Sequence, residues 1–112
     1  MENSINIIRA AHLILSAIPK ALTANASAFM ECCDRHDNLT AAVIAAFADL
    51  DYREQRVISM RLGFDAQTGF DPVPVCRYRE IATAFELTCA ATASNIFRRA
   101  CRKMAASIME AA

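Results

Sequence analysis

Residues that interrupt helices are scarce in this sequence of 112 residues, which contains two glycines, three prolines and no tryptophan. All-β proteins need glycine-rich turns and β-branched runs, so this composition argues against that class and favours helices. Hydrophobic residues make up 55% of the chain. A chain of this length buries about two-thirds of the surface that its unfolded form exposes. We therefore predict a folded, compact, all-α protein rather than a disordered chain.

Long apolar runs and paired cysteines are also missing. The longest apolar stretch near the start, residues 10–18, is interrupted by His12 and is much shorter than the roughly 20 residues that span a bilayer. Glu2 stands where a signal peptide has its positive region. The five cysteines contain no Cys-x-x-Cys pair, so neither a disulfide scaffold nor a cysteine-rich zinc site is predicted. We expect a cytoplasmic protein with reduced thiols and no membrane partner.

One polar break concentrates residues of the metal-binding type: Cys32, Cys33, Asp34, His36 and Asp37. Adjacent cysteines rarely bind one tetrahedral ion together, and no second ligand pair follows, so free thiols are the preferred interpretation. The sequence also has no Ser-His-acid arrangement, no glycine-rich phosphate loop and no isolated carboxylate pair. We therefore expect no metal, no cofactor and no enzymatic activity.

Positive charge is concentrated towards the C-terminus, although the formal net charge is zero. Residues 1–60 carry five basic and seven acidic side chains, a net charge of −2, whereas residues 77–103 carry six basic and two acidic side chains, a net charge of +4. An anionic partner responds to such a local field within a Debye length of about 8–10 Å. The uneven distribution is the first indication of function.

Apolar periodicity predicts helices everywhere except residues 63–76, the segment that holds both glycines and two of the three prolines. Asp51 and Glu54 have the spacing of a capping box, and Gly63 is placed to end the helix that follows. The first helix is apolar around most of its circumference, so residues 1–36 either complete the core or form a homodimer interface. We expect about six helices, at about residues 4–18, 19–33, 39–48, 51–62, 77–85 and 89–109.

The last predicted helix places apolar and polar residues on opposite sides. Its apolar side comprises Ala93, Ile96, Phe97, Ala100, Met104 and Ile108. Its polar side comprises Ser94, Asn95, Arg98, Arg99 and Arg102, with Thr92 and Lys103 at the margin. A short helix, a turn and a long basic helix have the geometry of a helix-turn-helix. The alternative is a solvated face, because the helix dipole favours cations near a helix C-terminus without any ligand.

Three further segments support the first interpretation: LDYREQRVISMRLGFD (50–65), YREIATAFELT (78–88) and IFRRACRKM (96–104). In this order they resemble region 4 of bacterial sigma factors, the promoter-recognising helix-turn-helix of the RNA polymerase specificity subunit. The resemblance covers about residues 39–104. It implies that residues 37–112 form a helix-turn-helix domain, to which residues 1–36 add a helical extension.

The resemblance also implies roles for individual residues. Arg79 would contact a phosphate at the start of the first helix of the motif. Thr92, Ser94, Asn95 and Arg98 would lie in the major groove of DNA. Arg99, Arg102 and Lys103 would follow the DNA backbone. The family also uses this domain to hold the flap of the polymerase β subunit.

We therefore predict a small DNA-binding transcription regulator, all-α with a C-terminal helix-turn-helix, that binds double-stranded DNA and also contacts RNA polymerase. An alternative prediction keeps the fold and is a protein-interaction module that docks on polymerase, a sigma factor or a second copy without reading DNA. Ala90 and Ala91 stand where the family carries base-reading residues, which favours this alternative, whereas the cations of the last helix oppose it. A third alternative is a viral packaging or replication accessory built on the same motif.

Overall fold

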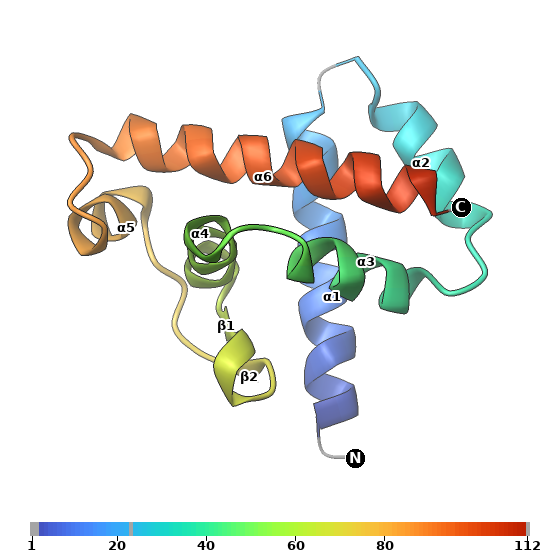
Figure 1. The fold of residues 1–112 in the computed structure, drawn as a ribbon, viewed down its shortest axis with the longest axis horizontal. Helices are drawn as coiled ribbons and strands as arrows, with labels where there is room; N and C mark the ends of the chain where they lie inside the picture. The colour runs from blue at the N-terminus through green and yellow to red at the C-terminus, as the bar shows by residue number, and fades with distance from the viewer. Residues whose placement is uncertain (1–2, 23, 112) are drawn as a thin grey trace.

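The computed structural model describes residues 3–22 and 24–111, and it confirms the predicted all-α architecture. The regular structure of these residues consists of six α-helices and a small two-stranded hairpin whose strands are joined by a 3-10 turn, Ala66–Thr68 (Figure 1). The helices are α1 (Asn3–Ala21), α2 (Ala26–Asp34), α3 (Leu39–Ala48), α4 (Tyr52–Leu62), α5 (Tyr78–Ala84) and α6 (Ala90–Glu110). The antiparallel hairpin pairs β1 (Phe64–Asp65) with β2 (Asp71–Pro72).

Helix α6 is the central element of the fold because it packs against each of the other five helices. It runs along the length of the molecule, with α5 and α4 towards its N-terminal end and α2 and α3 towards its C-terminal end (Figure 1). Its apolar side is buried as predicted. The buried residues are Ala93, Ile96, Phe97, Ala100, Cys101, Met104, Ala105 and Ile108.

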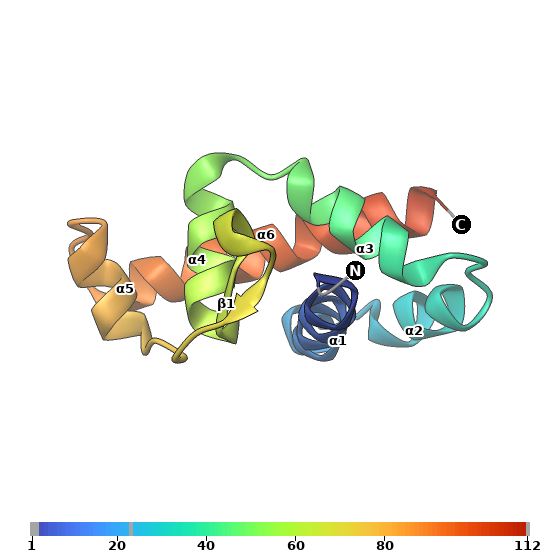
Figure 2. The same cartoon turned by 90° about the horizontal axis from the view of Figure 1, so that it is seen from below.

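Helix α1 contributes to the same hydrophobic core as α6. Ala10, Ile14 and Ile18 are each 0% exposed and belong to one buried cluster with Met104 and Ile108. Figure 2 shows α1 nearly end-on, beside α3 and α6, which it contacts. Part of the apolar breadth of the first helix is therefore used within the monomer, while Ile5 and Ile8 remain exposed.

Both ends of α4 follow the signals in the sequence. The Asp51 Oδ1 atom accepts the Glu54 N–H at 2.8 Å, and Glu54 Oε1 accepts the Asp51 N–H at 3.1 Å, which confirms the capping box. Gly63 ends the helix in the left-handed conformation with φ 87°. The Gln55 side-chain amide donates to the Phe47 carbonyl oxygen at the end of α3, so α3 and α4 are tied at their junction.

The predicted boundary at Pro19 is wrong. Helix α1 continues through Pro19 to Ala21, and α2 begins only at Ala26. A proline inside a helix removes one backbone hydrogen bond, which favours a break. Here Ile18 and Ala21, on either side of the proline, are 0% and 7% exposed. Their burial against the core offsets the lost hydrogen bond and keeps the last turn helical.

The predicted loop after α4 is held against its neighbours. The Arg9 Nη1 atom of α1 and the Val73 N–H both donate to the Gly63 carbonyl, at 3.1 Å each. The Cys76 N–H donates to the Met60 carbonyl at 2.9 Å. These bonds position the start of α5 beside α4. In the described part of the chain, no helix combines the length and the apolar character that crossing a bilayer requires.

Candidate nucleic-acid interface

Helices α5 and α6, which the sequence predicts to be a helix-turn-helix, are joined by residues 85–89 and pack against each other. Ile81 of α5 is 0% exposed, and the Tyr78 ring packs edge-on against Phe97 of α6 with centroids 6.0 Å apart. In the turn, the Leu87 N–H donates to the Ala82 carbonyl at 2.8 Å. Glu86 adopts φ 55°, a left-handed conformation that glycine adopts at lower cost. The angle between the two helices is thus set by buried contacts and by a turn that contains no glycine.

The outward face of α6, defined by Asn95, Arg98, Arg99 and Arg102, consists of exposed side chains. These four predicted site residues lie on one side of the helix, opposite the buried stripe. Thr92 and Ser94 are half-buried at the edges of this face. The other helices therefore leave the arginines accessible.

No carboxylate neutralises these arginines. Across residues 3–22 and 24–111, the one ion pair joins Glu54 to Lys103, so Arg98, Arg99 and Arg102 lack an acidic partner. Three like charges within two turns repel one another, and a bound anion relieves that repulsion. The outward face is therefore an accessible surface of positive charge.

Lys103 differs from the arginines because it also binds within the protein. Its Nζ atom lies 2.7 Å from Glu54 Oε2, and the two side chains are 54% and 7% exposed respectively. The pair joins α6 to the first turn of α4. The sequence does not predict this ion pair, because the two residues are 49 positions apart and no local pattern links them.

Arg79 is exposed on α5, close to the start of α6. It borders a shallow hollow together with Arg77, Glu80 and Ala90. Glu80 also accepts the Arg77 N–H at 2.7 Å through Oε1, which caps the start of α5. The structure thus places Arg79 beside the N-terminal end of the predicted recognition helix.

Cys89 occupies the N-cap position of α6 and is exposed. Its Sγ atom lies 3.7 Å from the Thr92 hydroxyl oxygen. Hydrogen bonds from the Thr92 side chain, and then from the Thr92 and Ala91 backbone N–H groups, lower the pKa of the Cys89 thiol. Burial has the opposite effect on Cys101, raising its pKa to about 12. A polarised thiol therefore lies at the start of the candidate recognition helix.

Cys32 and Cys33 lie at the end of α2, next to the polar break for which no metal site is predicted. Cys32 is buried and Cys33 half-buried, and both thiols are free. In the portion of the chain that the structure describes, no three His, Cys, Asp or Glu side chains are grouped closely enough to bind a metal ion together.

Comparisons with models of protein families, with curated proteins and with solved structures found no match for this chain.

Proposed function

We propose that this protein is a small DNA-binding transcription regulator that uses α5 and α6 as a helix-turn-helix. The observation that carries the proposal is the accessible, unneutralised set of Arg98, Arg99 and Arg102 on the helix that follows the turn. The sequence resemblance to sigma region 4 is a second support, and its segments 50–65 and 78–88 lie outside the arginine set. Contact with RNA polymerase belongs to this proposal through that resemblance.

The residues divide by the kind of contact they would make. Arg98, Arg99 and Arg102, with Arg79 from α5, are suited to phosphates because guanidinium groups form charge-assisted hydrogen bonds with them. Asn95 is exposed, and its amide has the donor and acceptor needed for adenine in the major groove. Thr92 and Ser94 lie at the edges of the same face. Lys103 lies at the margin of this face, where its charge is balanced by the ion pair with Glu54.

The salt dependence of binding to short DNA duplexes tests the proposal. About four to six phosphate contacts would give a slope of log affinity against log salt between about −3.6 and −5.4. Replacing Arg98 and Arg102 together by alanine should reduce the magnitude of that slope by about 1.8 and weaken binding to every duplex.

A matched control removes the same charge elsewhere. Arg35 and Arg53 are exposed and lie outside the α5–turn–α6 unit. The double variant Arg35→Ala, Arg53→Ala should retain the wild-type slope. Equal losses in the two double variants would mean that overall charge, and not the outward face, governs binding.

The second candidate function is a protein-interaction module. Exposed apolar side chains on α1 favour it: Ile5 is 76% and Ile8 is 49% exposed, one turn apart. Undetectable duplex binding at low salt, together with recovery of RNA polymerase on immobilised protein, would support this function and contradict the first.

A further inference from the structure

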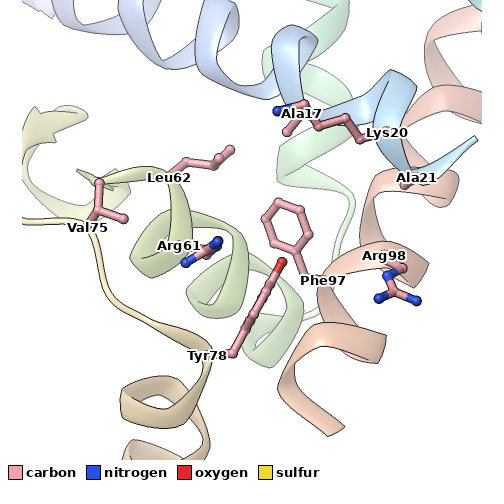
Figure 3. A pocket seen from close by; sticks show the side chains of 9 residues that line it. All are labelled: Ala17, Lys20, Ala21, Arg61, Leu62, Val75, Tyr78, Phe97 and Arg98. Atoms are coloured by element: carbon pink, nitrogen blue, oxygen red, sulfur yellow. The ribbon is translucent and has the colours of Figure 1, made fainter. Parts of the chain in front are cut away.

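A hollow of about 350 Å³ lies where α1, α4, α5 and α6 meet. Figure 3 shows the side chains around it, which come from all four helices and from the segment before α5. They are Ala17, Lys20, Ala21, Arg61, Leu62, Val75, Tyr78, Phe97 and Arg98.

Every charged side chain that lines the hollow is positive. Lys20 comes from the end of α1, Arg61 from the end of α4 and Arg98 from the outward face of α6. No acidic residue lines the hollow, and none of the three cations takes part in an ion pair within the described ranges. Three cations that border one hollow without a counter-charge raise the local positive potential.

Arg61 is held in place before any ligand binds. Its Nη1 atom donates to the Cys76 carbonyl at 3.3 Å, and its guanidinium carbon lies 4.3 Å from the centre of the Tyr78 ring. Tyr78 is supported in turn by its edge-on contact with Phe97. A guanidinium has five N–H donors, so the bond to Cys76 leaves several for a ligand. This fixed arginine lowers the entropic cost of binding an anion.

We propose that the hollow binds a phosphate group, with Lys20, Arg61 and Arg98 as its ligands. A phosphate monoester or pyrophosphate carries more charge and more acceptor oxygens than a carboxylate, which suits two guanidinium groups and one ammonium, and a DNA phosphodiester presents one charge and two free oxygens to the same groups. Lys20 lies outside residues 39–104, the part that resembles sigma region 4, so the N-terminal helix acquires a role in ligand binding. The phosphate belongs to the DNA backbone or to a small phosphorylated compound, and the first source rests on the proposed function.

Lys20→Gln is the decisive variant because Lys20 is exposed and forms no ion pair in the described structure. Arg53→Gln removes one exposed charge from the start of α4 and is the matched control. Thermal unfolding should be unchanged in both variants, which keeps binding effects separate from folding.

The first arm measures duplex affinity against salt. If the phosphate comes from DNA, Lys20→Gln should reduce the magnitude of the slope of log affinity against log salt by about 0.9. The affinity that the wild type gains when salt falls from about 1 M to about 0.1 M should then be about eightfold larger than the gain of the variant. Arg53→Gln should leave the slope unchanged.

The second arm titrates the protein with inorganic phosphate and pyrophosphate by calorimetry, without DNA. If the source is a small phosphorylated compound, the wild type should bind one anion, Lys20→Gln should weaken that binding at least several-fold, and the duplex slope should not respond to Lys20.

The outcomes separate the two proposals. If the wild type binds duplex, but Lys20→Gln changes neither the slope nor the affinity for phosphate and pyrophosphate, the phosphate site is wrong and the DNA-binding proposal stands. If no duplex is bound, yet phosphate or pyrophosphate binds in a Lys20-dependent manner, the DNA-binding proposal is wrong and the phosphate site stands. Absence of all binding contradicts both.

Discussion

Lys103 and Glu54 connect α6, the longest helix among the described residues, to the first turn of α4. The Lys103 ammonium lies 2.7 Å from Glu54 Oε2, while Glu54 Oε1 accepts the Asp51 N–H of the capping box. Glu54 as a whole residue is 5% exposed, and both of its carboxylate oxygens have a hydrogen-bond partner. A carboxylate in so buried a site is tolerated because its acceptors are satisfied. Lys103 thus has a structural role in addition to the DNA contact predicted for it.

Replacing Lys103 by methionine should lower the free energy of unfolding. The change keeps most of the aliphatic chain but leaves Glu54 Oε2 without its cation, at a cost of about 1–2 kcal/mol. Urea denaturation monitored by circular dichroism measures the loss. Arg99→Met, at an exposed and unpaired position of the same helix, should change stability by less than about 0.5 kcal/mol. Equal effects would mean that the ion pair contributes nothing.

Gly63→Ala should destabilise the protein by at least about 2 kcal/mol, the sum of left-handed strain and a steric clash. Gly63 has φ 87°, and an added Cβ would lie 2.9 Å from the Val73 carbonyl oxygen and 3.0 Å from Val75 Cγ2. Because Gly63 also accepts hydrogen bonds from Arg9 and Val73, its displacement would loosen the segment before α5. Urea unfolding checks the value, and a loss below about 0.5 kcal/mol would contradict the strained geometry.

The cysteines should react with a disulfide reagent in a defined order, Cys89 first and Cys101 last. The thiolate is the reactive form of cysteine. Because the pKa of exposed Cys89 is lowered, its thiol is deprotonated and reaches its full reaction rate at a lower pH than an ordinary cysteine does. Cys101 is 0% exposed, and burial raises its pKa to about 12, so it should stay unreactive until the protein unfolds.

Stopped-flow measurements from pH 6 to pH 10 resolve these phases. Cys89→Ser should abolish the fastest phase, and Cys101→Ser should leave it intact. If Cys89→Ser still shows a phase as fast as the fastest phase of the wild type, the lowered pKa of this thiol is contradicted.

Asn95→Ala should alter sequence preference more than overall affinity. Its exposed amide would discriminate one base pair by about 1–3 kcal/mol, whereas phosphate contacts supply most of the affinity. Selection of bound sites from a random DNA pool compares the two proteins. Arg99→Ala should instead weaken binding to all sequences alike, so an unchanged consensus in Asn95→Ala would remove this residue from base reading.

Local signals account for the elements that could be predicted well. Residues 39–48 form a helix with the predicted bounds, and the capping box at Asp51 and the left-handed Gly63 mark the ends of α4 as expected. The 3.6-residue periodicity of α6 identified its buried stripe and its exposed arginines. Each of these features depends on residues that are close in the chain.

Pro19 shows where local signals fail, since a proline in isolation favours a helix start and here the burial of Ile18 prevails. The ion pair of Lys103 with Glu54 could not be predicted either, and neither could the shared hollow that Lys20 and Arg61 line, because only packing brings these residues near one another.

The amino-acid order alone is therefore sufficient to define most of the helices, both ends of α4 and the basic face of the last helix, because hydrogen bonds and periodicity act over a few residues. Which cations are neutralised and which remain open to an anion depends on the packing of α1 and α4 around α6, since electrostatic interactions follow distance in space and not separation along the chain.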